Sequence, residues 1–430
     1  MELLEVKGDV MDIINKDPIC KLLPEKGWLR DYVIYSSGGW PPVREMPPRF
    51  NFFVGLVILG SVLRRRVYFE KENRLFPNLY IMLVSPPGVG KKTTAITYGE
   101  DLLMFLKTNK PRILPSKITP EDFLRFLALK QELIVGDKVE ISSSGLFMCS
   151  ELSVLMGKQQ YLVGLPQILT DLYDCPEIKE ISTIKHGKWV LKNIFISLVG
   201  GTTTESLQSS FPKEALEQGL LSRFIIINMP EDWDLRNPKP PRKDYQQREK
   251  LALELEKISK IEGEVKWASD AEKLYDQWYM ERTISKDIGY FEREPDHVIK
   301  LATLFEISST GQRVISLDTL SLTIKVANII AEDVMTYLPA LKAEIPNIRA
   351  AKVLRKLVEL GGLNKHINHS KLLLKCWHFL PGRGAEFNEI TQLLEELRVI
   401  DGKVVEGKKL YKAKTANLWI KTQVVKEEEE

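Results

Sequence analysis

The chain has 430 residues, 28% of them charged and 44% hydrophobic, a balance typical of a folded globular protein and not of a disordered chain. This length allows two or three domains and excludes a single small module. The net charge of +3 is too small to indicate a nucleic-acid-binding protein from composition, so any basic surface must come from local clustering.

The cysteines and the apolar segments predict a cytoplasmic protein. The four cysteines, Cys20, Cys149, Cys175 and Cys376, form no C-x-x-C pair, which argues against a zinc ribbon or a disulfide framework and fits a reducing cytoplasm. The most apolar segment, residues 52–63, is shorter than the ~20 residues that a bilayer crossing needs, so we expect a buried helix and no membrane partner. The N-terminus lacks the apolar core of a secretion signal.

A nucleotide-binding signal follows this helix. Residues 79–84 predict an apolar strand, and residues 85–94, SPPGVGKKTT, predict a glycine-turned loop and a helix start. Such a loop binds phosphates because its backbone N–H groups point inward, the helix N-terminus adds positive potential and one lysine reaches the terminal phosphates. We predict an ATP site here; the alternative is a glycine-rich turn without a ligand. The predicted binding residues are Ser85, Pro86, Pro87, Gly88, Val89, Gly90, Lys91, Lys92, Thr93 and Thr94.

The loop departs from the common pattern G-x-x-x-x-G-K-[ST] in two places. Ser85 replaces the first glycine, and Lys92 replaces the hydroxyl residue that normally ligates magnesium. Lys91 is therefore the predicted phosphate-binding lysine, while Lys92 adds a second cation beside the phosphates. Thr93 comes next and is predicted to bind Mg²⁺ in place of the missing hydroxyl. The sequence favours ATP binding over rapid hydrolysis.

Further along the chain, apolar runs predict a parallel sheet. A helix is predicted to begin with Thr119 as its N-cap and a proline as its first residue. Residues 145–149, 194–199 and 224–227 are short apolar runs that, with residues 79–84, give four buried strands separated by helices. The expected fold class is α/β, with a P-loop NTPase core built on a parallel sheet.

Polar residues follow two of these strands. Glu151 stands where an ATPase needs a carboxylate to orient water and magnesium, and its alternative role is to cap the next helix. Ser150 precedes it, where many such ATPases have an aspartate, and is a second predicted magnesium ligand. Thr202 and Thr203, after the third strand, are predicted either to sense the terminal phosphate or to cap the following helix.

Arg223 immediately precedes the fourth strand, in GLLSRFIII. An arginine in such a place often reaches a neighbouring subunit, where it stabilises charge on the transferred phosphoryl group and accelerates the reaction by ~10³ to 10⁵. This role requires a ring of subunits. The alternative is a salt bridge with Glu214, Glu217 or another acidic residue.

Composition divides the chain into five parts. Residues 230–243 are rich in proline and charge and predict a linker, after which the pattern is helical, without a strong strand signal, to residue 341. The tail predicts three helices and a hairpin at 399–411, with turn signals at Asp401-Gly402 and Glu406-Gly407. The parts are 1–48 (N-terminal region), 49–235 (P-loop ATPase core), 236–341 (helical connector), 342–418 (winged-helix domain) and 419–430 (acidic tail).

The predicted C-terminal domain has two candidate ligands. Its helices, glycine-containing turn and hairpin form a winged-helix pattern, and Lys403, Lys408 and Lys409 on the hairpin are placed to contact DNA phosphates. Its second helix is acidic, with Glu386 and Glu389 among others, which is poor chemistry for reading DNA. Docking of a protein is therefore the alternative.

Together these segments resemble the family of primase-helicase-type P-loop ATPases from phages, prophages and plasmids, a domain of unknown function. The similarity follows the order FPNLYIMLVSPPGVGKKT, SELSVLM, ISLVGGTTTESL, GLLSRFI and PDHVIKLATLFEIS, and ends in a winged helix. It implies a RecA-like or AAA+-like ring helicase with ATP and Mg²⁺ as cofactors and with Lys91, Glu151 and Arg223 in the roles above. LLSRF is also similar to the arginine-finger segment of ring helicases of the minichromosome-maintenance type. Lys300 stands where the family often has an arginine that senses nucleotide, so the resemblance implies a nucleotide-binding role for it.

The resemblance also implies the partners. They are single-stranded or forked DNA, further copies of the chain in a homo-hexamer, and a separate primase, because relatives often carry a primase domain for which this chain has no room. The first hypothesis is thus an ATP-dependent DNA helicase of a phage or mobile element. The alternative is a nucleotide-binding replication initiator or loader with slow or absent hydrolysis, suggested by Lys92 and Ser150. A third hypothesis is a DNA-binding initiator in which the winged helix dominates.

Overall fold

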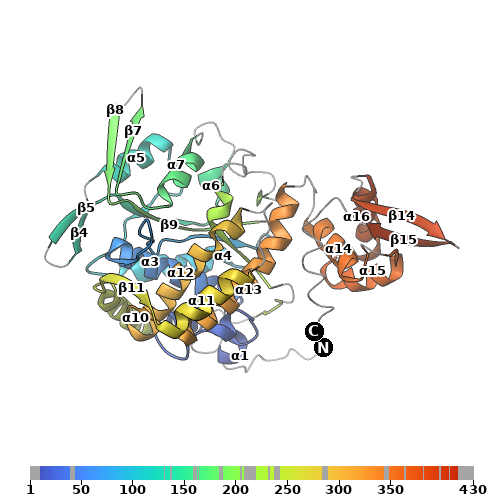
Figure 1. Cartoon of the computed structure of the whole chain (residues 1–430), viewed down its shortest axis with the longest axis horizontal. Coiled ribbons are helices and arrows are strands. Elements are labelled where there is room, and N and C mark those ends of the chain that lie inside the picture. Colours follow the sequence, from blue (N-terminus) through green and yellow to red (C-terminus); the bar gives the residue numbers. More distant parts are fainter. Residues whose placement is uncertain are drawn as a thin grey trace. The chain divides into compact units, whose positions relative to one another are not determined.

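The computed structural model divides the chain into two units, each described by itself (Figure 1). The first comprises Met1–Arg282 and Glu292–Ala331, and the second comprises Thr283–Phe291 and Glu332–Glu430. The predicted boundaries near residues 48 and 235 both fall inside the first unit. The described residues are 10–38, 44–129, 131–135, 138–157, 162, 164–183, 187–203, 206–207, 219–230, 233–236, 243–282, 289–342, 348–362, 365–380, 382–396, 399–405 and 407–414.

A five-stranded parallel sheet forms the centre of the first unit, with the strand order β10-β2-β9-β6-β3. Every residue of β2, β6, β9 and β10 is buried, as expected for parallel strands covered on both faces. The four predicted strands and the α/β class are confirmed, and the parallel sheet is consistent with a P-loop-type core. The strands are β2 Tyr80–Val84, β3 Ile113–Leu114, β6 Ser144–Cys149, β9 Phe195–Thr202 and β10 Phe224–Asn228.

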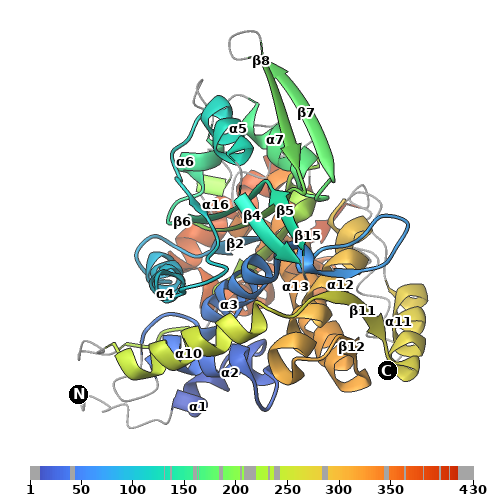
Figure 2. The ribbon, with the colours of Figure 1, turned by 90° about the vertical axis from the view of Figure 1, so that its left-hand side faces the viewer.

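Helices cover both faces of this sheet (Figure 2). The predicted apolar helix is α3, Pro48–Leu63, which is buried along its whole length and packs against β2, β9 and α4, Lys92–Met104. On the other side lies α5, Pro120–Ala128, which begins as predicted, because the Thr119 hydroxyl accepts a hydrogen bond from the Asp122 N–H at 3.2 Å. No helix in the described part of the chain is both long and apolar enough to cross a bilayer.

The remaining helices of the first unit frame this core, and α12 and α13 extend past its bounds. They are α1 Val10–Ile14, α2 Trp28–Gly38, α6 Ser153–Met156, α7 Leu165–Leu172, α10 Tyr245–Ile258, α11 Ser269–Glu281, α12 Tyr290–Thr310 and α13 Leu317–Lys342. Short 3-10 turns occur at η1 Cys20–Leu22, η2 Arg64–Arg66 and η4 Leu221–Arg223. The four cysteines of the chain are buried free thiols, as expected without a disulfide framework.

The expectation of a purely helical connector is wrong. Two strands lie within it, β11 Gly263–Trp267 and β12 Val314–Ile315, and they form a second parallel sheet with β1 Val67–Phe69 in the order β1-β11-β12. Strand β12 has two residues, which is too short to show an alternating pattern in the sequence. The helical segment is therefore joined by backbone pairing to β1, which precedes the predicted phosphate-binding loop. This loop, residues 85–91, is called the phosphate loop below.

Two antiparallel hairpins are inserted between the elements of the main sheet. One pairs β4, Gln131–Val135, with β5, Lys138–Ser142, before β6. The other pairs β7, Ile178–Thr183, with β8, Gly187–Lys192, before β9, and it projects from the rest of the first unit (Figure 2). Neither hairpin is predicted by the sequence reasoning above.

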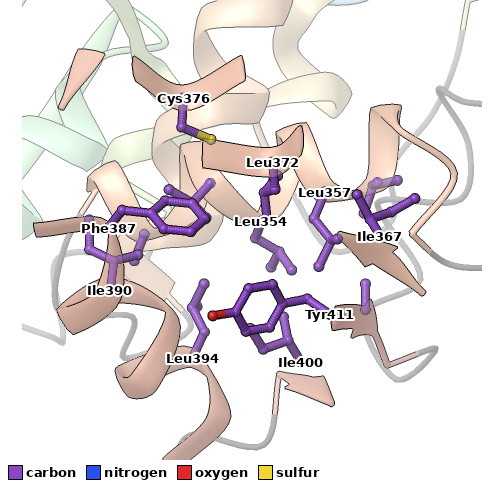
Figure 3. Close-up of a cluster of buried hydrophobic side chains, with 14 of the residues drawn as sticks. Leu354, Leu357, Ile367, Leu372, Cys376, Phe387, Ile390, Leu394, Ile400 and Tyr411 are labelled. Atoms are coloured by element: carbon purple, nitrogen blue, oxygen red, sulfur yellow. The ribbon is translucent and has the colours of Figure 1, made fainter. Parts of the chain in front are cut away.

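The second unit has its own core of buried side chains, shown in Figure 3. Leu354, Leu394, Ile400 and Tyr411 point toward a common centre there. Three helices and a hairpin occur in the predicted order, although Asp401-Gly402 lies inside a strand and is not a turn. The elements are α14 Ile348–Glu359, β13 Ile367–Asn368, α15 His369–Cys376, η5 Trp377–Phe379, α16 Arg383–Glu396, β14 Ile400–Val405 and β15 Lys408–Ala413, with the sheet order β13-β15-β14.

Candidate nucleotide site

The carboxyl edge of the main sheet gathers most of the predicted ATP-site residues. Strands β2 and β9 pair with Val84 opposite Thr202, and the Ser85 N–H donates to the Thr202 carbonyl at 3.4 Å. Next to them, the Leu152 N–H donates to the Gly201 carbonyl at 2.7 Å. Because parallel strands end at one edge, the phosphate loop, the Ser150-Glu151 segment and the end of β9 meet there. A crevice at the carboxyl ends of parallel strands is the usual ligand site of such sheets.

The phosphate loop leads directly into α4. Gly88 has a φ of +74°, in the region that glycine adopts without strain. Lys91, the N-cap, also has a left-handed backbone, with φ 49° and ψ 34°, and its half-exposed ammonium lies 3.8 Å from a Glu45 carboxylate oxygen. Lys92 is the first residue of α4 and is buried, and its ammonium donates to the Ser85 carbonyl at 3.0 Å and to the Ser85 hydroxyl at 2.7 Å.

Two hydroxyl groups hold the Glu151 carboxylate at this edge. One of its oxygens accepts hydrogen bonds from the Ser153 hydroxyl at 3.2 Å and from the Ser206 hydroxyl at 3.5 Å. The Thr203 hydroxyl accepts a hydrogen bond from the Ser206 N–H at 3.1 Å. This is the geometry of a helix cap, the alternative role predicted for Thr203. Thr202 is fully buried at the end of β9. The carboxylate is thus positioned between the ends of β6 and β9.

The oxygen donors at this edge fit a magnesium ion that keeps most of its water. Thr93 lies exposed on the first turn of α4, Ser150 is exposed at the end of β6, and Glu151 is next to it. Mg²⁺ prefers oxygen ligands and is usually held through one or two protein groups, waters and phosphates. No group of three or more His, Cys, Asp or Glu suited to a metal occurs among the described residues.

Arg223 lies at the opposite edge of the sheet. Strands β10 and β2 run parallel, with Phe224 opposite Tyr80 and Asn228 opposite Val84. Arg223 precedes the first of these pairs and Ser85 follows the last. At about 3.3 Å per residue, roughly 20 Å of strand separates them. Arg223 therefore cannot reach a phosphate held by the loop of its own subunit.

Asp174 is the acidic partner of Arg223 at this amino edge. The two side chains form an ion pair at 3.4 Å, and Arg293 of α12 contacts the other carboxylate oxygen of Asp174 at 2.8 Å. Burial lowers the pKa of the Arg223 guanidinium, Arg293 lowers it further and Asp174 opposes the shift. The alternative partners Glu214 and Glu217 lie outside the described residues.

Lys300 also lies at the amino edge and not beside the phosphate loop. Its buried ammonium donates to the Asn78 side-chain oxygen at 2.8 Å and lies 4.0 Å from the centre of the Tyr173 ring. Burial lowers its pKa to about 8. Lys300, Asp174 and Arg293 line a cavity of about 1310 Å³. The structure thus separates Lys300 and Arg223 from the other predicted nucleotide-site residues.

The lysines predicted to contact DNA lie on the hairpin of the second unit. Lys403, Lys408 and Lys409 are exposed on β14 and β15. The Lys409 ammonium lies 3.3 Å from a carboxylate oxygen of Glu395 in α16, which reduces its availability for phosphates. His369 hydrogen-bonds the Tyr411 hydroxyl at 3.1 Å.

Sequence reasoning missed Asp174 and Arg293. Asp174 lies 49 residues before Arg223 and 119 before Arg293. A single acidic residue at such separations carries no local signal, because helical and strand patterns extend over a few residues. The hairpin β7–β8 had no strand signal before its turn, because Ile178, Ile181 and Ile184 recur every third residue and do not alternate.

No family model and no curated protein matches the sequence. Among solved structures, a full-length MCM homolog from Methanopyrus kandleri is similar to the chain, with a TM-score of 0.40 and 11% sequence identity. The alignment covers 77% of this chain and 63% of that chain. These values assign no family, so the function is inferred from the geometry of the two sheet edges.

Proposed function

We propose that the protein is an ATP-hydrolysing ring, a homo-hexamer that acts as a DNA helicase in the replication of a phage or mobile element. One observation carries this proposal: the phosphate loop and Arg223 occupy opposite edges of one sheet. A loop that binds phosphate at one edge and an arginine at the other complement each other only between subunits that associate head to tail. Closure of such an association gives a ring.

Each half of this shared site has a defined task. The phosphate loop with its lysines holds the triphosphate over the start of α4. Glu151 accepts a proton from the attacking water and orients it. Thr93 and Ser150 would hold Mg²⁺, which would neutralise charge on the phosphates. Arg223 of the next subunit leaves its ion pair with Asp174 and contacts the phosphoryl group that is transferred.

The proposed DNA contacts are on the inserted hairpin β7–β8 and on the C-terminal hairpin. Two exposed lysines of β8 belong to an element that projects from the first unit (Figure 2): Lys192, and Lys188, whose ammonium lies 2.7 Å from a carboxylate oxygen of Glu180 on β7. Side chains of this kind bind a phosphate backbone without reading sequence. We assign single-stranded or forked DNA to β7–β8, duplex DNA to Lys403 and Lys408, and primer synthesis to a separate primase.

Mixing two inactive variants tests the shared site. Glu151→Gln removes the carboxylate of one half and Arg223→Ala the arginine of the other, so each variant alone should lose ATPase activity by on the order of 10³-fold. Equal amounts mixed before assembly should recover about a quarter of the wild-type rate, because that share of interfaces joins an intact loop half to an intact arginine. A mixture no more active than its components would overturn the proposal that subunits share the site.

A second candidate function is a nucleotide-dependent loader that hydrolyses ATP slowly. It is favoured by Ser150, which supplies a hydroxyl where a magnesium-binding ATPase gains from a carboxylate. Steady-state ATPase assays with and without single-stranded DNA separate the two functions. The helicase requires turnover that rises with DNA and disappears in Glu151→Gln, whereas the loader binds ATP but shows no DNA-stimulated turnover.

A further inference from the structure

We propose that Lys92, and not Lys91, is the lysine that contacts the terminal phosphates, so that the loop functions in the register Lys92-Thr93. This inference rests on the proposed function, since it concerns the same ATP site. It reverses the assignment that the sequence pattern gives, because the pattern places its lysine directly after Gly90. The environments of the two lysines differ in backbone conformation, burial and partners.

Lys91 serves the backbone of the loop. Its φ of 49° is in the left-handed region, which is strained for a residue with a Cβ and suits glycine. Its side chain is 47% exposed, and its ammonium lies 3.8 Å from a carboxylate oxygen of Glu45, which is itself 34% exposed. A left-handed residue followed by a right-handed one turns successive N–H groups into one concavity that binds anions. Lys91 thus contributes N–H geometry, while its charge is directed to Glu45.

Lys92 places its charge inside the loop. It is the first residue of α4, only 9% exposed, and its ammonium is held by both the carbonyl and the hydroxyl oxygen of Ser85. Ser85 begins the loop directly after β2, so these two hydrogen bonds connect the start of the loop to the start of the helix. A phosphate held by the loop lies over this helix start. The ammonium of Lys92 is therefore fixed beside the phosphate position.

The stem of Lys92 packs on the sheet edge that holds the other site residues. A Cβ built on Gly201 of β9 would lie 3.2 Å from the Lys92 Cβ and 2.7 Å from the Ser150 carbonyl oxygen. Gly201 thus leaves the space through which Lys92 approaches the ends of β6 and β9. Glu151 follows Ser150 there, so the proposed phosphate cation and the proposed base are neighbours.

The shifted register also accounts for the missing hydroxyl. In the common pattern, a serine or threonine directly follows the lysine and ligates magnesium. Read from Lys91, the next residue is a second lysine; read from Lys92, it is Thr93. The predicted magnesium ligand then stands at its usual place relative to the lysine.

Lys91→Met and Lys92→Met form a matched pair, because both keep an unbranched side chain and remove one charge. We expect the full-length Lys92→Met variant to bind ATP at least tenfold more weakly than wild type by isothermal calorimetry. Lys91→Met should stay within threefold. A loss confined to Lys91→Met, or equal losses in both variants, would overturn the assignment. A wild-type chain without any ATP binding would instead overturn the proposed function itself.

Lys91→Gly keeps the test decisive if Lys92→Met does not fold. Glycine adopts the left-handed backbone of this position without strain, so the variant should fold at least as well as wild type. With its charge removed, it should still bind ATP within threefold of the wild-type affinity. A folded Lys91→Gly chain that has lost ATP binding shows that Lys91 is the phosphate lysine and the inference is wrong.

Discussion

Three lysines of the first unit show how surroundings decide what an ammonium group does. Lys91 is half exposed and close to Glu45, Lys92 is buried on two oxygens of Ser85, and Lys300 is fully buried against Asn78 and Tyr173. Removing an ammonium from water is costly unless polar partners replace the water. For Lys300 the replacement is incomplete, since burial lowers its pKa to about 8.

Because of Lys300, the free energy of unfolding should rise as the pH increases in the alkaline range. Its pKa in the folded chain, about 8, is below the value of 10.5 for a free lysine, so the unfolded chain binds more protons between these values. The penalty for burying the charge is complete below pH 8 and is relieved as the pH rises to 10.5. The free energy of unfolding of the wild type should therefore rise by up to about 3 kcal/mol relative to that of Lys300→Met over this range.

Urea unfolding of wild type and Lys300→Met at pH 7 and pH 10 measures this gain. The hydrogen bond to Asn78 is lost in the variant at both pH values, so it cancels in the comparison. Other groups that titrate at high pH are present in both proteins; the pKa of Cys175, which Lys300 itself lowers, is raised by burial to about 11, above the range of the comparison. A free-energy difference between the two proteins that is the same at both pH values would show that Lys300 is not held with a lowered pKa.

At the scale of elements, the strands of the main sheet were predictable because they are buried on both faces. Such strands are continuous apolar runs, and β2, β6, β9 and β10 all read this way. The hairpin strands β7 and β8 carry many polar side chains, and β12 has two residues, so neither gives a clear periodicity.

The candidate site was predictable to the same extent. The loop, Glu151 and Thr202 meet because parallel strands end at one edge, which follows from the strand prediction alone. Which lysine faces the loop depends on the residue at which α4 begins, because each residue rotates the side chain by about 100°. The pairing of Arg223 with Asp174 depends on tertiary packing, which a local pattern does not contain.

The projecting hairpin β7–β8 should couple DNA to ATP turnover. We expect a Lys188→Ala, Lys192→Ala double variant to lose most of the stimulation of ATPase by single-stranded DNA while it keeps the basal rate, because neither lysine lies at the nucleotide site. Lys250→Ala, on the exposed face of α10, is the control and should be stimulated like wild type. Full stimulation of the double variant at physiological salt would exclude β8 as the DNA contact.

At the scale of the whole molecule, the chain combines a unit with the candidate nucleotide site and a unit with its own apolar core (Figure 3). The second unit carries both a basic hairpin and the acidic α16, whose Glu386 is paired with Arg349 at 2.5 Å. Basic and acidic faces favour different partners. Whether the hairpin lysines bind DNA therefore distinguishes DNA from a protein as the partner of this unit.

Removing the charges of Lys403 and Lys408 tests duplex binding. A Lys403→Ala, Lys408→Ala double variant should bind duplex DNA more weakly and show a salt dependence reduced by about two phosphate contacts, one for each lysine. Its ATP affinity should be unchanged. Lys409→Ala serves as the comparison, because Lys409 already pairs with Glu395 and should contribute less. Unaltered affinity and salt dependence in the double variant would favour protein docking through this unit.

In the proposed ring, the position of Arg223 at the amino edge would give every contact between subunits a direction. An open row of subunits has an unused phosphate loop at one end and an unused arginine at the other, and closing the row completes the last site. The rate of ATP hydrolysis is then proportional to the number of completed sites between subunits and not to the number of chains. A subunit without Arg223 keeps its own loop intact and leaves only the site of the neighbouring subunit incomplete, so each such subunit should remove one active site from a ring.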